Sequence, residues 1–342
     1  MFARTNPKCF ANKISSIISK SNSTYTKPRI GVNPAYDEAL KVIESFRSSK
    51  LNQIQEIEAQ IKKEESLEKT NLLSNQKTEL EVLADRYLGE TKWNVRNDNY
   101  DLTKPVYRKI LQEEFRKRPL EVIMQRSHQM FVIPDVIDPS LFPSASAQLN
   151  LTFDAVQSDP IAPGIRIEPQ DAKELPKIQL MSFSEKPQLY TIVMVDPDVP
   201  NETEQTYTQT CHWATCNVPF DIYNQQFSPE TMGDKALDYL PPHPPFGSKV
   251  HRYIFVALKQ GENGDQKLSK EDFSRDFNLR EFTLKHGLVP AGVSFFRSEW
   301  NATVDEFYQN VLGQKPPRYG EPLSYNPNIG RDGQRLRRYE NM

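Results

Sequence analysis

The sequence predicts a mainly β core that is preceded by an α-helical arm and followed by an irregular basic tail. Short β-rich runs recur between residues 149 and 258, and clusters of Pro, Asp, Asn and Gly separate them. Strands without interleaved helices are typical of antiparallel sheets rather than of a doubly wound α/β fold. Between residues 34 and 90, apolar side chains recur at spacings of three and four, which predicts helices.

These patterns divide the 342 residues into four parts. We expect a mitochondrial transit peptide in residues 1–30 and a helical extension in residues 31–134. The β domain is expected in residues 135–312, with helices at its carboxyl end. Residues 313–342 are poor in apolar side chains and cannot bury a core of their own, so they are expected to form an extended basic tail.

The first 36 residues hold six basic and no acidic side chains, set among Ser, Thr and Asn. Together with apolar residues at helical spacing, this composition is typical of a mitochondrial transit peptide, here with cleavage expected near residues 20–35. The alternative is a basic tail that stays on a cytosolic protein. The chain has no run of about 18 apolar residues, so the sequence predicts no membrane span.

The formal charge of the chain is almost balanced, with 43 basic and 45 acidic side chains. This balance excludes a uniformly basic nucleic-acid coat. The balance hides a pattern, because residues 135–310 carry 14 basic and 25 acidic side chains, while residues 91–134 and 311–342 are net basic. If nucleic acid is a partner, we expect these basic parts to contact it, because the acidic body would repel phosphate.

The helical extension is predicted to begin at Pro34, to break or bend at Thr70-Asn71, and to end at Gly89. Its apolar seam is narrow and its charged face is wide, so it needs a partner surface. Two arrangements meet this need: a helical hairpin packed on the β domain, or a coiled coil with another protein.

A further helical run in residues 106–115 ends in three basic residues before Pro119. Cations at this place complement the helix dipole, and the same side chains could face phosphate groups. The candidates for contact with RNA or a partner in this part are Arg108, Lys109, Arg116, Lys117 and Arg118.

Three short motifs concentrate polar chemistry. Asp196 and Asp198 follow a buried-looking strand and are held by neighbouring prolines, His212 opens the next strand, and a proline-rich stretch leads into residues 251–253. In an extended strand, His251 and Tyr253 point to one face and the arginine between them to the other. Two histidines, two aspartates and a tyrosine that converge would form a small polar pocket.

The same motifs exclude several functions. The sequence contains no glycine-rich nucleotide-binding loop and no G-x-S-x-G element. Cys211 and Cys216 flank His212, but a zinc site would need a second pair of ligands at regular spacing. We therefore expect no catalytic residues, no metal, no cofactor and no enzyme activity. A hydrolase remains the weakest alternative, since paired carboxylates are present without an identified nucleophile.

The order of these motifs, residues 190–200, then His212-Trp213, then Gly247 and His251-Arg252-Tyr253, resembles the phosphatidylethanolamine-binding protein (PEBP) family. The resemblance covers about residues 135–312. It implies a large antiparallel sheet packed on a smaller one, with carboxyl-terminal helices, and a small pocket for phospholipid head groups or phosphorylated ligands. The pocket residues it implies are Asp196, Asp198, Pro200, His212, His251 and Tyr253.

Two departures from the family pattern concern this pocket. Asn201-Glu202 adds negative charge after the aspartate motif, and Lys249 stands where the family typically has glycine and could narrow the mouth of the pocket. We expect the geometry of the pocket to persist without a physiological small-molecule ligand.

The tail interleaves arginines with tyrosines, a combination that suits phosphate contact and base stacking on RNA, although a free tail would explain it too. Its contact candidates are Lys315, Arg318, Tyr319, Arg331, Arg335, Arg337 and Arg338. The whole arrangement resembles PEBP-like proteins of the mitochondrial large ribosomal subunit. This resemblance implies a structural role in the mitochondrial matrix, with mitochondrial ribosomal proteins and large-subunit rRNA as partners. The alternative is a free PEBP-type regulator that binds phospholipids or anions.

Overall fold

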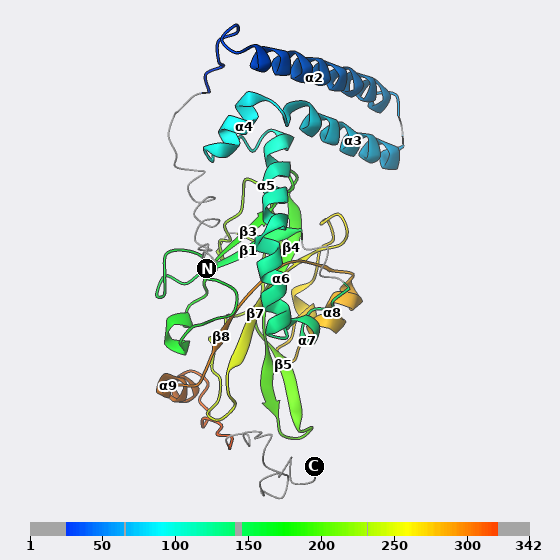
Figure 1. Cartoon of the computed structure of the whole chain (residues 1–342). Helices are drawn as coiled ribbons and strands as arrows, with labels where there is room; N and C mark the ends of the chain where they lie inside the picture. The colour runs from blue at the N-terminus through cyan, green and yellow to red at the C-terminus, as the bar shows by residue number, and fades with distance from the viewer. Residues whose placement is uncertain (1–24, 65, 141–145, 231, 321–342) are drawn as a thin grey trace, which may run out of the picture.

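The structure, a computed structural model, describes residues 25–64, 66–140, 146–230 and 232–320. Figure 1 shows a helical hairpin at one end of the molecule and a β body at the other, joined by α5. The helices are α2 (Pro34–Ile61), α3 (Leu67–Asp85), α4 (Gly89–Arg96), α5 (Pro105–Lys117), α6 (Pro119–Gln129), α7 (Val132–Asp135), η2 (Pro169–Ala172), η3 (Lys270–Asp272), α8 (Leu279–His286) and α9 (Ala302–Asn310). The strands are β1 (Ala147–Thr152), β2 (Ile165–Arg166), β3 (Lys177–Ser182), β4 (Gln188–Asn201), β5 (Thr206–Phe220), β6 (Asp234–Leu237), β7 (His251–Lys259) and β8 (Val289–Ser298).

The β body consists of a large sheet and a small one, as predicted. The large sheet has the strand order β2-β8-β7-β4-β5-β6, and the small sheet pairs β1 with β3. All pairs are antiparallel except β2 with β8, which is parallel. The predicted mainly β core with a helical arm is therefore confirmed, with one parallel pair that the sequence pattern did not indicate.

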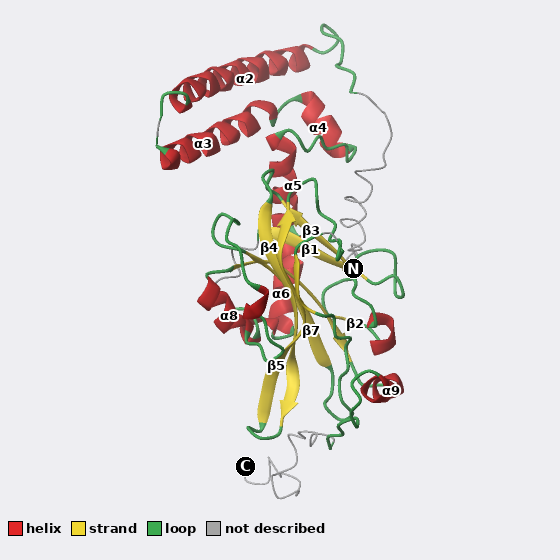
Figure 2. Ribbon diagram, turned by 180° about the vertical axis from the view of Figure 1, so that it is seen from behind, coloured by secondary structure: helices red, strands yellow, loops and turns green. Residues whose placement is uncertain are grey.

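Each face of the large sheet is covered by a different layer (Figure 2). On one face, Val193 and Val256 pack against apolar side chains from α7 and α8. On the other face, Ile192 and Phe255 pack against Leu149 and other residues of the small sheet. The alternation of side chains along β4 and β7 thus supplies two cores from the same strands.

Strand β8 was missing from the strands that the sequence predicted. Pro290 and Gly292 interrupt its apolar pattern and suggest a loop. Pro290 lies at a register shift between β7 and β8, where a ladder hydrogen bond is not required. At Gly292 an added Cβ would lie 2.9 Å from the carbonyl oxygen of Ala147, so the glycine permits the close approach of β1.

The helical extension forms an intramolecular hairpin of α2 and α3. The break lies at residues 62–66 rather than at Thr70-Asn71, because the Thr70 hydroxyl donates to the carbonyl of Ser66 and continues α3. Salt bridges join the two helices, Arg47 with Asp85 at 3.0 Å and Lys77 with Glu58 at 2.8 Å. No helix in the described part of the chain is long and apolar enough to cross a membrane.

Helices α5 to α7 connect this hairpin to the sheet. Arg86 of α3 makes a bidentate pair with Glu113 of α5 at 2.9 and 2.7 Å. Further along, Val132 and Ile133 are buried in the core of the large sheet, with Ile123 of α6 packed against them. The helical extension and the β domain therefore share one core across the boundary predicted at residue 135.

A buried ion pair holds this helical layer on the sheet. Arg252 on β7 donates from Nε and Nη2 to the carboxylate of Asp198 on β4, at 2.8 and 2.6 Å. Its Nη1 donates to the carbonyl of Met130 at the end of α6 and to Asp135 of α7, both at 2.9 Å. One guanidinium thus links two strands to two helices, and its side chain is only 16% exposed.

Replacing Arg252→Met should lower the free energy of unfolding by about 2–4 kcal/mol, because Asp198 would keep a largely buried charge without its partner. Urea denaturation monitored by circular dichroism measures this loss. Lys285→Met, at an exposed position on α8, serves as the control and should change the stability by less than about 0.5 kcal/mol. An equally small effect for Arg252→Met would contradict the role of this link.

Candidate functional site

The centre of the predicted pocket is an ion pair between Asp196 of β4 and His251 of β7. The Oδ2 atom of Asp196 lies 2.7 Å from Nδ1 of His251, and the two side chains are 2% and 1% exposed. The backbone N–H of Asp198 donates to the second carboxylate oxygen at 2.9 Å. The sequence prediction that Asp196 and His251 converge is thus met, but they meet inside the protein rather than at an open mouth.

The pKa shifts of both members favour their charged forms. Burial alone would raise the pKa of Asp196, but the charge and the hydrogen bond of His251 outweigh it and hold this pKa below its ordinary value. Burial likewise opposes protonation of His251, yet Asp196 outweighs it and raises the pKa of His251. The pair therefore stabilises the fold most between the ordinary pKa values of the two groups, about 4 and 6.5.

His212 and His243 form the neutral part of the site. His212 lies 4.0 Å from the Asp196 carboxylate, and its Nδ1 donates to the carbonyl of Leu240 at 2.9 Å. Burial, helped by the nearby His243, lowers the pKa of His212 to about 3, and burial also lowers that of His243. The rings of the two histidines are 5.0 Å apart.

The ring of Tyr253 lies edge-on to that of His212, with the ring centres 5.2 Å apart. The side chain is fully buried. Burial, followed by the charge of Asp196, raises the pKa of Tyr253 well above its ordinary value, so the hydroxyl keeps its proton. Asp196, His212, His251 and Tyr253 thus form one buried polar centre.

One of the predicted pocket residues lies elsewhere. A register irregularity of β4 between Asp196 and Val199 turns Asp198 to the opposite face, where it binds Arg252. The prediction that Asp198 lines the pocket is therefore wrong. Pro200 lies further along β4, opposite Tyr207 in the β4–β5 hairpin, and its place in the pocket stays a prediction.

Ser248, His251 and Asp196 follow one another in the same order as the Ser-His-Asp triad of a hydrolase. The Oγ atom of Ser248 lies 2.7 Å from Nε2 of His251, whose Nδ1 faces Asp196. Two features oppose this chemistry. The raised pKa of His251 favours the protonated ring, which is not a base, and the Ser248 hydroxyl donates to the carbonyl of Pro245 at 2.8 Å. No group of three or more His, Cys, Asp or Glu side chains suited to a metal ion occurs among the described residues.

The beginning of the tail lies against the loop that leads into this site. The backbone N–H of Tyr319 donates to the carbonyl of Phe246 at 2.8 Å, and Arg318 pairs with Asp305 at 2.8 Å. The Arg318 guanidinium also lies 5.4 Å from the centre of the Phe246 ring. We call residues 315–320 the strap, because this segment is fastened to the loop at both Arg318 and Tyr319.

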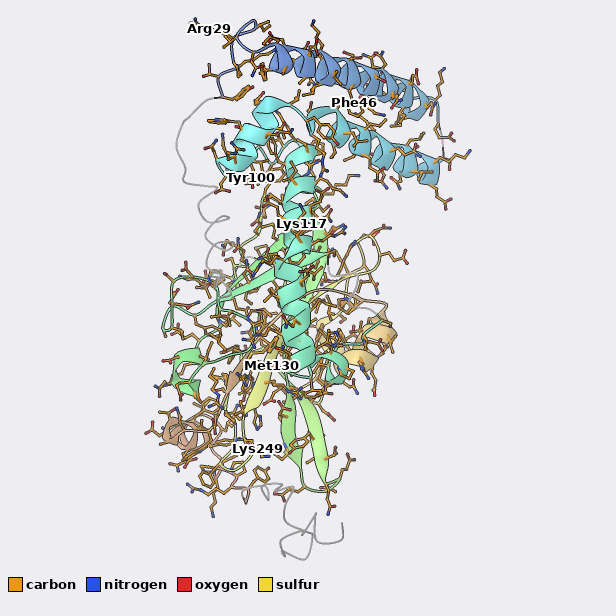
Figure 3. All side chains as sticks on the ribbon, in the orientation of Figure 1. Arg29, Phe46, Tyr100, Lys117, Met130 and Lys249 are labelled. Carbon is orange, nitrogen blue, oxygen red and sulfur yellow. The ribbon has the colours of Figure 1, made fainter. Side chains whose placement is uncertain are left out.

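Gly247 makes the strap possible. Its φ of +86° is a left-handed conformation, and an added Cβ would lie 2.0 Å from the carbonyl oxygen of Tyr319. Lys249, which the sequence suggested as the group that narrows the mouth, is exposed with a φ of +69° and is labelled in Figure 3. The strap contacts the loop next to the site through the backbone of Tyr319.

The basic contact candidates have different environments. Arg108 is buried and its guanidinium donates to the carbonyls of Leu102 and Thr103 and to Glu185, a position at odds with the contact role predicted for it. The side chains of Lys109, Arg116, Lys117, Arg118 and Lys315 are exposed. Arg331, Arg335, Arg337 and Arg338 lie outside the described residues, as do residues 1–24 of the predicted transit peptide.

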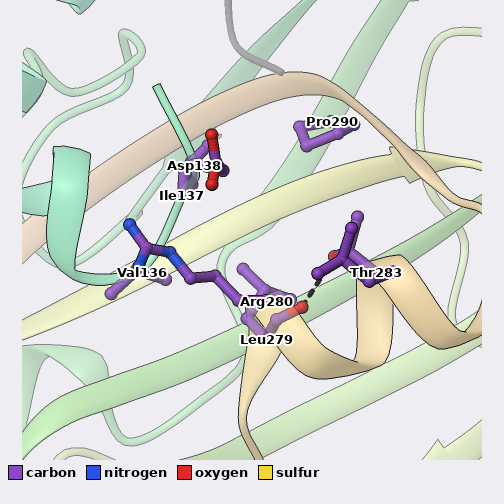
Figure 4. A pocket seen from close by; sticks show the side chains of 8 residues that line it. Val136, Ile137, Asp138, Leu279, Arg280, Thr283 and Pro290 are labelled. Carbon is purple, nitrogen blue, oxygen red and sulfur yellow. Dashed lines mark hydrogen bonds between the residues drawn. The ribbon is translucent and has the colours of Figure 1, made fainter. Parts of the chain in front are cut away.

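Sequence reasoning missed His243, Ser248 and the strap. His243 stands between two proline pairs, and that signal could have placed it in the site. A separate shallow hollow lies on the helical face of the sheet, between α7 and α8 (Figure 4). It is lined by Val136, Ile137, Asp138, Leu279, Arg280, Thr283, Leu284 and Pro290.

The β body matches a known family. Residues 157–303 match the family model described as phosphatidylethanolamine-binding protein. This part of the chain is therefore a PEBP-like domain. Two solved structures resemble it: a carboxypeptidase Y inhibitor complexed with its cognate proteinase, at 22% identity and a TM-score of 0.44, and a phosphatidylethanolamine-binding protein from Plasmodium vivax, at 16% and 0.40. They cover 53% and 52% of this chain, and 96% and 97% of their own.

Two curated relatives differ in how much of the chain they match. The chain is 27% identical over 268 residues to the large ribosomal subunit protein mL38 of Schizosaccharomyces pombe, which covers 78% of this chain and 83% of that protein. It is also 27% identical over 192 residues to the putative odorant-binding protein A5 of Drosophila melanogaster, covering 54% of this chain and 84% of that protein.

The buried histidines predict a specific dependence of stability on pH. The pKa of His212 is about 3 in the folded chain and about 6.5 when unfolded, so below pH 6.5 only the unfolded chain takes up this proton. Stability therefore falls as the pH falls, by about 2 kcal/mol at pH 5 from this group. In His212→Asn, the decrease in unfolding free energy between pH 7 and pH 5 should be smaller by that amount, as measured by urea denaturation.

The matched control for this experiment is His128→Asn, which makes the same replacement at an exposed histidine of α6. If His212→Asn and the natural chain lose the same stability between pH 7 and pH 5, His212 is not held neutral in the folded protein.

Gly247→Ala should release the strap, since the new methyl group would occupy the position of the Tyr319 carbonyl oxygen. We expect trypsin to cleave the bond after Arg318 at least about tenfold faster, because the free energy needed to open the strap locally would fall by about 1–2 kcal/mol. Gly287→Ala is the control, as Gly287 has a similar φ of +60° with nothing within 4 Å of the added Cβ. Equal cleavage rates in the two variants would refute the fastening of the strap by Gly247.

Proposed function

We propose that this protein is a structural constituent of the mitochondrial large ribosomal subunit. In this proposal the PEBP-like body docks among neighbouring ribosomal proteins, and the extensions contact protein and rRNA in the mitochondrial matrix. The observation that carries the proposal is the extent of the similarity to mL38. That alignment covers 268 residues, whereas the family model matches only residues 157–303, so the similarity includes parts of the chain outside the family domain.

The geometry of the site supports a structural rather than a ligand-binding or catalytic role. Asp196, His212, His251 and Tyr253 are all almost completely buried, and their charges are balanced within the pair. The strap lies against the loop that contains Gly247 and Ser248. In our proposal this polar centre fixes the packing of β4, β5 and β7, and no small molecule is needed for function.

The helical extension offers surfaces for the proposed partners. On the hairpin, the apolar side chains of Val42 and Leu72 are 69% and 59% exposed. On α5, Lys109, Arg116 and Lys117 are exposed. We propose that the hairpin contacts ribosomal proteins and the basic side chains contact rRNA, with residues 1–30 serving as the transit peptide and residues 313–342 as a further contact segment.

Sedimentation of a mitochondrial lysate through a sucrose gradient tests this proposal. The epitope-tagged full chain should migrate with the large subunit, and it should remain there at 0.5 M salt, at which surface charge contacts alone are largely screened, with a Debye length of about 4 Å. Migration as a free species of 39.5 kDa or less would refute the proposal and favour a free PEBP-type anion- or phospholipid-binding regulator.

The double variant Asp196→Asn and His251→Asn separates the structural role from a ligand-binding role. Replacing both members of a buried ion pair with neutral amides is expected to change stability by no more than about 2 kcal/mol. The variant should therefore enter the large subunit to the same extent as the natural chain and should support mitochondrial translation. Normal incorporation with loss of mitochondrial translation would show that the charged pair has a function beyond structure.

A further inference from the structure

Strands β7, β8 and β2 bring three arginines into one row on the helical face of the sheet. Arg252 lies directly opposite Arg297 in the antiparallel β7–β8 pair, and Arg297 lies opposite Arg166 in the parallel β8–β2 pair. Cross-strand partners point to the same face, and like charges in that position repel each other. Such a row is therefore unfavourable unless anions compensate it.

A fourth arginine approaches this row from the helix above it. The carbonyl of Met130 accepts from Arg252, and the sulfur of Met130 lies against Gly164, whose carbonyl accepts from Nε of Arg297 at 2.9 Å. Arg126 precedes Met130 by one helical turn, and its carbonyl accepts from the backbone N–H of Met130 at 3.0 Å, so both residues lie on the same side of α6. Consistent with this geometry, partial burial and then the charges of Arg166 and Arg126 lower the pKa of Arg297.

The carboxylates that face these four arginines do not balance them. Asp198 and Asp135 are both taken up by Arg252. Arg166 pairs with Glu299 at 3.2 Å, and both side chains are more than half exposed. Within the described part of the chain, Arg297 and Arg126 make no ion pair, so Arg126, Arg166 and Arg297 share a single exposed carboxylate.

We propose that Arg126, Arg166 and Arg297 form a binding site for backbone phosphates of RNA. This inference rests on the proposed function, which supplies rRNA as the polyanion, and it adds a contact site on the body that is distinct from the basic extensions. Guanidinium groups bind phosphate oxygens through paired N–H donors, and they do so with less loss of hydration than ammonium groups. Arg297 is held in place by its bond to Gly164, so part of the site is already ordered before RNA binds.

The proposal explains why the row is tolerated in an otherwise acidic body. A phosphate placed between Arg126 and Arg297 would remove the repulsion that the register of β7, β8 and β2 creates. In this proposal the guanidinium groups contact phosphates, and such contacts position the RNA backbone without reading its base sequence.

The test measures binding of the purified full chain to a fluorescent 12-nucleotide oligouridylate between 50 and 200 mM salt. For single strands, each phosphate contact adds about 0.7 to the slope of log K against log salt. The double variant Arg126→Gln and Arg297→Gln should bind about tenfold more weakly at 50 mM salt, with a slope smaller by about 1.4.

A matched control removes the same charge elsewhere. Lys267→Gln with Lys285→Gln replaces two exposed cations, and this variant should retain the slope of the natural chain. Thermal melting checks that both variants fold; removing like charges should leave the arginine variant at least as stable as the control. Equal slopes in the two variants, an unchanged slope in the arginine variant, or no RNA binding by the natural chain would each overturn the proposal.

A ten-residue oligoaspartate distinguishes RNA from an acidic protein segment. If the peptide binds more tightly than the RNA and depends on the same arginines, the site serves a protein partner and the proposal is wrong.

The sucrose gradient keeps this inference separate from the proposed function. If the natural chain fails to migrate with the large subunit, the proposed function is refuted. If it does migrate, but the slope of log K against log salt is the same with and without Arg126 and Arg297, only this site is refuted.

Discussion

The contact of Arg252 with Asp198, Asp135 and Met130 is the interaction on which the rest of the structure depends. It fixes α6 and α7 against the large sheet, and this joins the helical arm and the β body into one core. Because the backbone of Asp198 donates to Asp196, the same contact also supports the buried polar centre on the opposite face. Two consecutive residues of β7 thus place His251 on one face of the sheet and Arg252 on the other.

The two faces of the sheet have different physical characters as a result. On the face toward the small sheet, charge is enclosed and balanced, since Asp196 and His251 neutralise each other among neutral histidines. On the helical face, Arg252 binds Asp198 and Asp135, while Arg297 and Arg126 make no ion pair within the described residues. Under the proposed function, these unpaired cations are available to a polyanionic partner.

Local pattern was enough to predict the β class, the alternation of His251, Arg252 and Tyr253, and the convergence of Asp196 with His251. It failed where a bulge changes the alternation, as at Asp198, or where a bulge accommodates a proline, as at Pro290 in β8. It also could not show pairings between distant segments. The strap joins Phe246 to Arg318, and the arginine row depends on the register of three strands, and neither leaves a signal in the residues close to it in sequence.

Electron cryo-microscopy of the mitochondrial large subunit from the source organism is the decisive measurement for the proposed function. We expect density for this chain on the subunit, with the strap seated on Phe246, no small molecule between His251 and Tyr253, and RNA phosphates beside Arg126 and Arg297. Maps in which every protein of the large subunit is assigned without this chain would contradict the proposed function. A chain that is present with its strap displaced and a ligand bound at His251 would contradict it as well.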